Sequence, residues 1–436
     1  MFVKNQDLTP QLNPQSQFGL LDCNNFYASC ERVFQPTLNK TPVIVLSNND
    51  GCVVSRSNEA KTLDIKMGVP AFKLKALLQE QKIKVFSSNY ALYNDMSQRV
   101  MGALAELVPH LEIYSVDEAF LDLTGFHPSE LRTFGENLVK TIQQWTGIPV
   151  SLGMGSTKTL AKVANHIAKK NKMGRGVFEI NANNRERILA QFKIEDVWGI
   201  GKNWATKLNQ RGIVNAYELS QRTYPELQKQ FNKTLASTAL ELQGTPVHKI
   251  ETLKKPKKEI MVSRSFGQIL TDYDALREAI ATHTAHAIQK LRSQHAVAKS
   301  ITIFLQTNRF HQAEEPYHYD ALIELPIPSQ DTRDFLKAAE QGLKQLYKSK
   351  SLAYKKAGVI LREISPKEKG QIDLFSTADP KAIAQIEVLD RINRTFGKGT
   401  CRFAVEGYTK TWLGQSRDRS RAYTTCWSEL PVVQAN

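Results

Sequence analysis

Apolar residues in the first part of the chain follow two spacings. Short apolar runs at 17–22, 41–48 and 148–155 have the length of buried strands. Apolar residues at helical spacing over 129–146 and 156–171 predict two helices. Strands that alternate with helices in this way indicate an α/β or α+β domain whose sheet is backed by helices.

The pattern changes near residue 190 and then becomes helical, with short turns, to about residue 245. The basic, proline-containing stretch "KKPKKE" at 254–259 is typical of a linker. Strand and helix patterns alternate again over 260–363, and the periodicity weakens beyond about 365. These changes predict an α+β multidomain protein that follows a polar N-terminal arm.

Asp117 and Glu118 stand side by side in the apolar stretch "EIYSVDEAFLDLTG" at 112–125. Buried neighbouring carboxylates repel one another and lose hydration unless a cation or hydrogen-bond donors compensate them. Because adjacent side chains of a regular strand point to opposite faces, both can serve one site only where the backbone bends. A solvated acidic hairpin turn is the alternative. Asp122 fits a solvated or turn-capping role better.

Asp22 ends the first apolar strand and supplies a third carboxylate. Three hard oxygen donors around one point are the ligands that Mg²⁺ prefers. A pair of such ions stabilises the attacking and leaving oxygens of phosphoryl transfer. The sequence leaves open whether these carboxylates converge.

The composition is basic, with 58 Lys and Arg against 43 Asp and Glu and a formal net charge of +15. Such an excess indicates a polyanionic partner, nucleic acid before an anionic membrane, with a merely basic enzyme as the alternative. The five cysteines form neither a CxxC pair nor a disulfide framework, which fits a reducing cytosol. No apolar run reaches the ~18 residues of a membrane span, and the N-terminus lacks a signal-peptide core. We therefore expect a cytoplasmic protein without a membrane partner.

The helix predicted over 156–171 begins a stretch that has several basic residues and no acidic residue as far as Gly176. Lys158 and Lys162 lie one turn apart on this helix. We expect them to contact DNA phosphates, and a solvated charged face is the alternative.

Gly199 and Gly201 of "WGIG" precede a predicted helix, and "RGI" at 211–213 follows it. Glycines let the backbone approach a phosphate, and the next helix N-terminus directs N–H groups toward it. This pattern predicts a sequence-independent DNA contact, with an ordinary helix–helix turn as the alternative.

The stretch "GQIDLFS" at 370–376 places apolar residues in a segment with little core of its own. Exposed apolar residues in a tail often belong to docking peptides. A short strand packed on the body of the protein is the alternative.

Several stretches together resemble the Y-family of translesion DNA polymerases, and most closely its UmuC type. They occur in the order "DCNNFYASCE", "SNNDGCVVSRSNEAK", "KMGVP", "FSSNYALYNDMS", "YSVDEAFLDLTG" and "GMGSTKTLAKVANHIAKK". The resemblance runs from Phe18 into the C-terminal region, and the joint occurrence in this order is far more specific than any one motif.

The resemblance implies a right-hand polymerase with palm, small fingers, helical thumb containing a helix-hairpin-helix, little finger and C-terminal tail. The expected boundaries are an arm at 1–17, a palm at 18–40 and 101–185, fingers at 41–100, a thumb at 186–250, a linker at 251–259, a little finger at 260–364 and a tail at 365–436. The implied activity is error-prone transfer of a dNTP to a primer 3′-hydroxyl opposite damaged template during the SOS response. A metal-dependent nuclease and a non-catalytic DNA-binding scaffold are the rival functions.

The resemblance also assigns roles to individual residues. It implies that two Mg²⁺ ions bind Asp22, Asp117, Glu118 and the Cys23 carbonyl. The residues that it implies for nucleotide binding are Tyr27 beneath the sugar, with Ser55 and Lys169 at the triphosphate. Asn58 and Lys61 stand where many members of the family have a Tyr and an Arg, and a lysine lacks the bidentate fork of arginine.

The expected partners are primer–template DNA, dNTP, the UmuD′ dimer, RecA and the β sliding clamp. "QIDLF" is similar to the clamp-binding peptide of bacterial polymerases, so the clamp is assigned to Gln371, Ile372, Leu374 and Phe375. The residues alone define no surface for UmuD′ or RecA.

Overall fold

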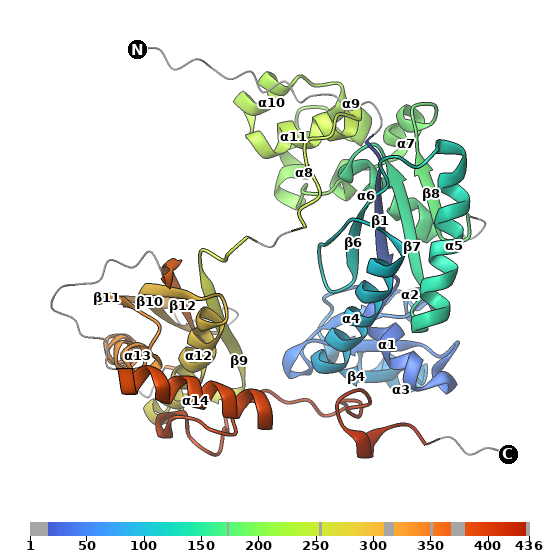
Figure 1. The fold of residues 1–436 in the computed structure, drawn as a ribbon. Helices are drawn as coiled ribbons and strands as arrows, with labels where there is room; N and C mark the ends of the chain where they lie inside the picture. Colours follow the sequence, from blue (N-terminus) through green and yellow to red (C-terminus); the bar gives the residue numbers. More distant parts are fainter. Residues whose placement is uncertain are drawn as a thin grey trace, which may run out of the picture. The chain divides into compact units, whose positions relative to one another are not determined.

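The chain folds into two units, shown in Figure 1. The structure is a computed structural model that describes residues 16–171, 174–252, 255–308, 318–348, 352–367 and 380–432. Unit 1 comprises Met1–Leu46, Cys52–Lys254 and Asp418–Asn436, and unit 2 comprises Ser47–Gly51 and Lys255–Arg417. Within the described residues, no helix is both long and apolar enough to cross a membrane.

A five-stranded sheet in the order β5-β6-β1-β7-β8 forms the centre of unit 1. Its strands are β1 (Phe18–Cys23), β5 (Leu111–Ile113), β6 (Glu118–Asp122), β7 (Val150–Gly155) and β8 (Val177–Ile180). The first strand is central and antiparallel to both neighbours, while β7 and β8 are parallel. The apolar runs that predict strands at 17–22 and 148–155 are therefore confirmed.

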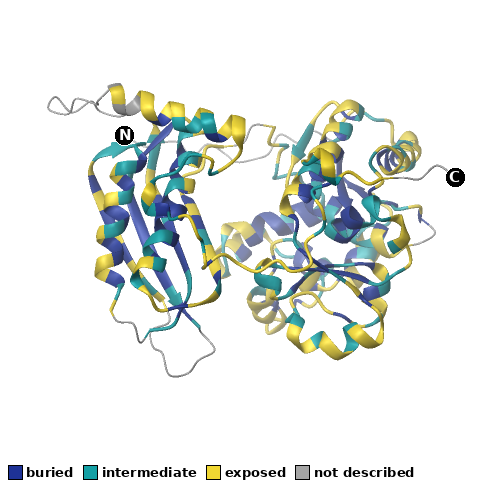
Figure 2. Ribbon diagram, turned by 90° about the horizontal axis from the view of Figure 1, so that it is seen from below, coloured by how far each residue is buried: buried dark blue, intermediate teal, exposed yellow. Residues whose placement is uncertain are grey.

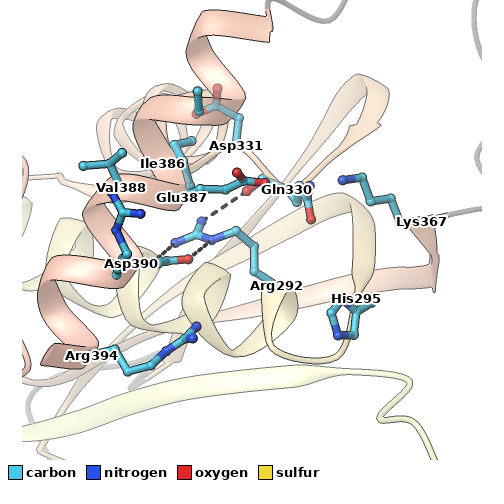
Figure 3. A pocket seen from close by; sticks show the side chains of 12 residues that line it. Arg292, His295, Gln330, Asp331, Lys367, Ile386, Glu387, Val388, Asp390 and Arg394 are labelled. Carbon is cyan, nitrogen blue, oxygen red and sulfur yellow. Dashed lines mark hydrogen bonds and ion pairs between the residues drawn. The ribbon is translucent and has the colours of Figure 1, made fainter.

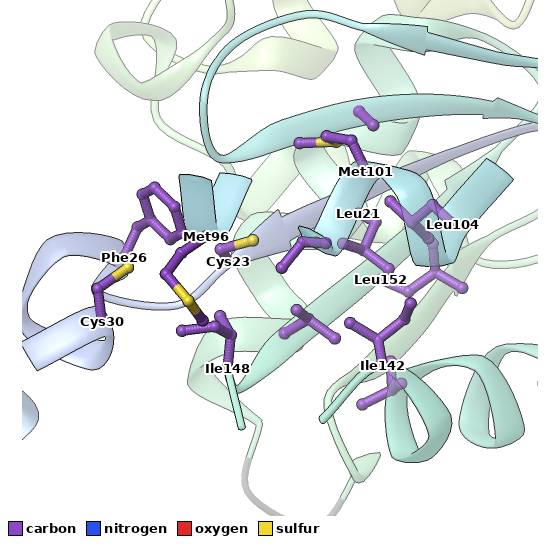
Figure 4. Packing of buried hydrophobic residues seen from close by; sticks show 14 of the residues in the cluster. Leu21, Cys23, Phe26, Cys30, Met96, Met101, Leu104, Ile142, Ile148 and Leu152 are labelled. Atoms are coloured by element: carbon purple, nitrogen blue, oxygen red, sulfur yellow. The ribbon is translucent and has the colours of Figure 1, made fainter. Parts of the chain in front are cut away.

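The two faces of this sheet are covered by different helices. Leu21, Cys23 and Leu152 face a core shared with α1 (Phe26–Phe34), α4 (Tyr90–Leu107) and α5 (Pro128–Thr146), part of which Figure 4 shows. The alternate residues Leu20 and Phe120 belong to a separate cluster that includes Ala161 of α6 (Lys158–Lys170). Because side chains alternate along a strand, Asp22 and Glu118 lie on the α6 face.

Helix α6 packs directly on the backbone of the sheet. Asn165 donates side-chain hydrogen bonds to the carbonyls of Leu20 (3.1 Å) and Ser151 (2.9 Å). A Cβ atom at Gly153 would lie 2.0 Å from the Asn165 backbone nitrogen, so only glycine allows this approach. The close contact fixes the lateral position of α6, and with it the residues that face the sheet.

Two smaller substructures complete unit 1. A three-stranded sheet, ordered β3-β2-β4, consists of β2 (Val43–Leu46), β3 (Val53–Arg56) and β4 (Lys84–Ser87), and has its own apolar cluster with α2 (Asn58–Thr62) and α3 (Lys75–Glu80). A helical substructure contains α7 (Arg185–Gln191), α8 (Lys202–Asn209), α9 (Ala216–Ser220), α10 (Tyr224–Gln230) and α11 (Lys233–Gln243) around another cluster.

Unit 2 is built on a four-stranded antiparallel sheet in the order β11-β10-β12-β9. Its elements are β9 (Ile260–Leu270), α12 (Tyr273–Arg292), β10 (Ala296–Thr307), β11 (His318–Ser329), α13 (Thr332–Leu346) and β12 (Tyr354–Pro366). Both helices share the core with one face of the sheet. In β11 buried and exposed residues alternate, because one face of this strand packs on the core. Figure 2 shows the same division on the helices, which are dark blue on one side and yellow on the other.

The region beyond residue 365 contains a helix, although the periodicity of its apolar residues is weak. Helix α14 (Pro380–Phe396) is anchored to unit 2 by Arg292, whose guanidinium donates to both Asp390 carboxylate oxygens at 2.6 and 2.7 Å (Figure 3). The remaining nitrogen of Arg292 donates to the Thr332 hydroxyl at 2.8 Å. The region predicted as one tail is thus divided, since residues as far as Arg417 belong to unit 2 and those from Asp418 belong to unit 1.

Candidate active site

The three candidate carboxylates meet at one end of the five-stranded sheet. Asp22 and Glu118 are directly paired across β1 and β6. Asp117 precedes β6 in a bend, where its carbonyl accepts a hydrogen bond from the Cys23 N–H at 2.8 Å. The three carboxylates therefore converge, a point that the sequence alone left open.

A serine stabilises the bend that places Asp117 and Glu118 at one site. The Ser115 hydroxyl donates to Asp117 Oδ1 at 2.5 Å and accepts from the N–H groups of Asp117 (3.2 Å) and Glu118 (3.0 Å). The adjacent acids therefore do not occupy two successive positions of a regular strand. Asp122 instead accepts from the Thr124 N–H at 3.0 Å, the turn-capping role expected of it.

Three lysines of α6 neutralise carboxylates on the same face of the sheet. The nitrogen–oxygen distances of the ion pairs are 2.6 Å for Lys169–Asp22, 2.9 Å for Lys162–Glu118 and 2.5 Å for Lys158–Glu112. These lysines lie four and seven residues apart, which places them along one stripe of the helix. The basic stripe of α6 therefore faces the sheet.

The burial of Lys158 argues against the prediction that this residue contacts DNA, while the DNA contact of Lys162 stays a prediction. Lys158 is only 3% exposed and lies 4.8 Å from the centre of the Phe120 ring, so no phosphate reaches it. The Lys162 ammonium is held by Glu118 and lies over the rings of Tyr114 and Trp198 at 4.5 and 5.3 Å. The alternative of a solvated face does not fit Lys158 either, because this lysine is buried.

Asp22 is the most strongly perturbed carboxylate of the site. Burial raises its pKa from the ordinary 3.8 to about 7, and the neighbouring charges of Glu118 and Asp117 add to this effect. Lys169 opposes the shift through its charge and its hydrogen bond. The electrostatics therefore favour additional positive charge beside Asp22.

A cleft of about 400 Å³ opens beside Asp22 and Asp117. It brings together seven of the predicted site residues: Asp22, Cys23, Tyr27, Ser55, Lys61, Asp117 and Lys169. Sequence reasoning missed other lining residues, among them Asn25, Arg56 and Met67. Arg56 follows Ser55 in the strand, and its Nη1 donates to the Ile65 carbonyl.

Tyr27 projects from the first turn of α1 into an aromatic group. Its ring stacks on Tyr93 of α4, with centroids 4.4 Å apart and an interplanar angle of 14°. Tyr90 meets it edge-on at 6.0 Å. Tyr27 is only half-buried and lines the cleft, so one side of a supported ring is available to a ligand.

Ser55 and Asn58 have structural partners. The Ser55 hydroxyl accepts from the Ala28 N–H at 3.2 Å and donates to the Asn25 carbonyl at 3.3 Å, so it fixes the start of α1. Asn58 Oδ1 accepts from the Asn25 side chain at 3.0 Å and from Lys61 at 3.3 Å. Asn58 does not line the cleft directly.

Three basic groups, Lys61, Arg56 and Lys169, line the cleft together with Asp22 and Asp117. Burial, followed by the charges of Arg56 and Lys169, lowers the pKa of Lys61. Mutual repulsion of this kind shows that the three cations lie close enough to act on one another. Three positive charges so close together favour the binding of a polyanionic ligand.

Gly199 and Gly201 form the expected turn before α8. Gly199 has φ +84°, and Gly201 is the N-cap of the helix in an extended conformation without a side-chain cap. No atom lies within 4 Å of a Cβ built on either glycine, so the backbone of the turn is accessible. Residues 371–375, the predicted clamp peptide, lie outside the described residues.

The side chains of the site are not set around a metal ion. Among the residues that the structure describes, no three His, Cys, Asp or Glu side chains are arranged to hold one. Lysine ammonium groups and the Ser115 hydroxyl engage the carboxylates instead. The donor chemistry nevertheless fits a hard divalent cation, because three carboxylates from two strands meet beside the cleft.

The comparisons with known proteins define the family. The impB/mucB/samB family model matches residues 21–166, and the model of its C-terminal domain matches 257–374. A domain of unknown function, DUF4113, matches 386–433. The chain belongs to the impB/mucB/samB family.

Comparison with individual relatives narrows the assignment within this family to the UmuC type. The chain is 43% identical to protein UmuC of Salmonella typhimurium over 96% of this chain and 100% of that protein. It is 35% identical to protein MucB of Escherichia coli over 95% of this chain and 99% of the relative. The resemblance to UmuC-type Y-family polymerases is thereby confirmed.

Solved structures confirm the fold class. A Y-family DNA polymerase chimera, Dbh-Dpo4(243-245)-Dbh, matches with a TM-score of 0.65 and 23% identity over 80% of this chain and 99% of that one. An insertion ternary complex of Dbh DNA polymerase matches with a TM-score of 0.54 over the same shares. The fold is that of the Y-family right-hand polymerases.

Asp22 gives a testable pH dependence in metal-free protein. Its pKa is higher in the folded chain than the ordinary 3.8, so folding favours the protonated form and Asp22 destabilises the fold as it ionises. The free energy of unfolding of Asp22→Asn, minus that of wild type, should grow between about pH 4 and pH 7 and then level off. Urea denaturation in the presence of a chelator measures this difference, and a flat difference across the window contradicts the electrostatic account.

Proposed function

We propose that this chain is an error-prone, DNA-directed DNA polymerase that copies damaged template in the SOS response. It would transfer a nucleotide from a dNTP to a primer 3′-hydroxyl and release pyrophosphate. The observation that carries the proposal is the cleft in which Asp22 and Asp117 face a group of cations. Family membership and 43% identity to a UmuC protein support the same activity.

The carboxylates would hold two Mg²⁺ ions. Asp22, Asp117 and Glu118 would supply the side-chain oxygens and Cys23 its carbonyl, by the match to the family motif. Bound there, the ions would stabilise the attacking and leaving oxygens of nucleotidyl transfer. The raised pKa of Asp22 supports this role, because a site short of positive charge favours cation binding.

The basic side of the cleft would bind the triphosphate. Lys169 now pairs with Asp22, and an entering triphosphate would offer its ammonium group a second anionic partner. Lys61 and Arg56 would add charge from the three-stranded sheet. Ser55 would act mainly by fixing the start of α1, and Asn58 by orienting Lys61.

Tyr27 would select the sugar. Its ring is held from behind by Tyr93 and borders the cleft beside Asp22 and Asp117. A ring fixed in this place would contact the C2′ edge of a bound nucleotide and leave space for hydrogen but not for hydroxyl. Selectivity would then arise from repulsion of the wrong substrate.

DNA contacts would be distributed over several parts of the chain. The accessible turn at Gly199 and Gly201 would donate backbone N–H groups to a phosphate. The formal charge of +15 supports a polyanionic partner. Domain roles follow the expected boundaries, with the palm on the five-stranded sheet, the fingers on the three-stranded sheet and the thumb on α7–α11.

The UmuD′ dimer and RecA are proposed as partners from the family resemblance alone. A sliding clamp is proposed as a third partner, because "QIDLF" has the composition of a docking peptide.

The clamp assignment predicts a separation of functions. Replacing both Leu374 and Phe375 with Ala should abolish clamp binding and leave synthesis without the clamp intact. Two buried apolar anchors are worth about 3–6 kcal/mol at most, so their loss would weaken a micromolar contact of about 8 kcal/mol to the millimolar range. A pull-down with purified clamp tests this, and undiminished binding contradicts the assignment.

The metal assignment predicts the effect of removing one charge. Asp117→Asn should reduce primer extension to below roughly 1% of wild type, since loss of a charge-stabilising group typically costs 10²-fold or more. Primer–template binding should change by only a few-fold. Asp122→Asn is the matched control, because its charge lies at the far end of β6 and serves a turn cap.

The same measurements separate the rival functions. A non-catalytic scaffold predicts no dependence on metal and no effect of Asp117→Asn. A nuclease predicts no specific binding of dNTP, so a dNTP titration that gives no binding contradicts the polymerase assignment.

The sugar-selection role predicts a change in substrate preference. Tyr27→Ala should yield a folded enzyme that incorporates ribonucleotides readily. If Tyr27 were only a core aromatic, the variant should lose roughly 3–5 kcal/mol of stability and all activity together. The ratio of dNTP to rNTP incorporation, measured beside the melting temperature, separates these outcomes, and an unchanged ratio in a folded variant contradicts the role.

A further inference from the structure

The C-terminal segment 418–430 packs against the part of unit 1 that carries the cleft. Its first residues extend the three-stranded sheet at β4. The Ser87 N–H donates to the Asp418 carbonyl at 3.0 Å, and the Asp418 N–H donates to the Ser87 hydroxyl at 3.0 Å. A parallel bridge joins Ser87 to Arg419.

An aromatic anchor fixes the segment further along. Tyr423 is 7% exposed and stacks on Phe34 of α1, with ring centroids 4.9 Å apart and planes within 7°. Its hydroxyl accepts from the Gln35 side chain at 2.9 Å. A buried ring with a paired hydroxyl indicates a specific contact, because each of its groups finds a partner.

Ser420, between these two contacts, reaches a buried carboxylate. Its hydroxyl donates to Glu31 Oε1 at 3.0 Å, and the Tyr93 hydroxyl donates to the same oxygen at 2.6 Å. Glu31 is fully buried, and its other oxygen finds no hydrogen-bond partner among the residues that the structure describes. The Ser420 and Tyr93 hydroxyls are therefore the side-chain donors that compensate this carboxylate.

The segment is also bonded to the start of the helix that carries Tyr93. The Asn89 side chain caps α4 by accepting from the Leu92 N–H at 3.4 Å. Its amide nitrogen donates to the Ser420 hydroxyl at 3.1 Å and to the Ser420 and Arg421 carbonyls. Both the helix and the hydroxyl of Tyr93 are thus tied to residues 420 and 421.

Tyr93 connects these contacts to the cleft, because its ring stacks on Tyr27 at 4.4 Å. We propose that segment 418–430 positions the sugar-contacting face of Tyr27, acting through Ser420, Glu31 and Tyr93, and thereby sets discrimination against ribonucleotides. Ser420 and Tyr93 are positioning residues in this proposal, which rests on the proposed function of Tyr27. It gives a role to part of the region that matches a domain of unknown function.

Burial raises the pKa of Glu31 to about 7, which agrees with a carboxylate that needs its donors. Without the Ser420 hydroxyl, Glu31 would keep Tyr93 as its side-chain donor, and the tail would lose its hydrogen bond to the carboxylate that holds Tyr93. The Tyr93 ring would then be held less firmly. Because Tyr27 stacks directly on Tyr93, the position of the Tyr27 ring would also be less fixed.

The experiment uses the full chain and compares dNTP with rNTP incorporation opposite one template base. Ser420→Ala should lower the dNTP-to-rNTP ratio roughly 3- to 10-fold, the scale of one ordinary hydrogen bond. Ser420→Thr, which keeps the hydroxyl, should restore the ratio. Trp427→Ala in the same segment is the control, because this side chain is 89% exposed.

A double variant separates positioning from general stability. In a Tyr27→Ala background, Ser420→Ala should not lower the ratio further, since the ring that it positions is gone. A purely structural role would reduce dNTP and rNTP incorporation together and leave the ratio unchanged. Tyr93→Phe provides a second test, because it keeps the stacked ring and removes only the bond to Glu31.

The outcomes distinguish this proposal from the proposed function. If Tyr27→Ala leaves the ratio unchanged, the sugar-selection role fails and the positioning proposal fails with it. If Tyr27→Ala lowers the ratio but Ser420→Ala and Tyr93→Phe do not, only the positioning proposal is overturned.

Discussion

The structure of unit 1 depends on compensation of the carboxylates that lie between its central sheet and α6. Glu112, Glu118 and Asp22 lie on one face of three neighbouring strands, and each is paired with a lysine of the same helix. Without these partners the acids would be poorly hydrated charges in an apolar layer. The pairing requires α6 to lie against the sheet, which Gly153 permits and Asn165 secures.

The same constraint explains where the site lies. Asp22 is the second-last residue of β1 and Glu118 begins β6, so their charges stand at the end of the sheet, where the cleft opens. The bend held by Ser115 adds Asp117 to this end and removes it from the regular strand. A cluster of like charges is therefore placed at the boundary of the core, where mobile cations and substrate have access.

Much of the site could be predicted from the sequence, because apolar runs that end in acids indicate strand ends, and adjacent acids require a bend. The direction of the lysine stripe could not be predicted, since helical spacing identifies a face but not what covers it. Lys158 is therefore buried against Glu112 where a DNA contact was expected. Ser420 and Glu31 are 389 positions apart in the sequence, so no periodic pattern of residues predicts the hydrogen bond between them. Helix α14 was not predicted because the ion pair between Arg292 and Asp390 holds it to unit 2, while Ile386 is the one hydrophobic residue of its described part that is buried.

The three lysines of α6 differ in how firmly each one is bound to its carboxylate partner. The exposed fraction of the lysine side chain rises along α6, from 4% for Lys158 to 16% for Lys162 and 39% for Lys169. A buried ammonium group cannot exchange its carboxylate without a large loss of solvation, whereas an exposed one exchanges partners at little cost. Lys158 is therefore a structural counter-charge, whereas Lys169 at the cleft is the lysine that we propose turns from Asp22 toward a ligand. One helix thus serves both the stability of the sheet and the chemistry at its end, because its axis runs from the core to the cleft.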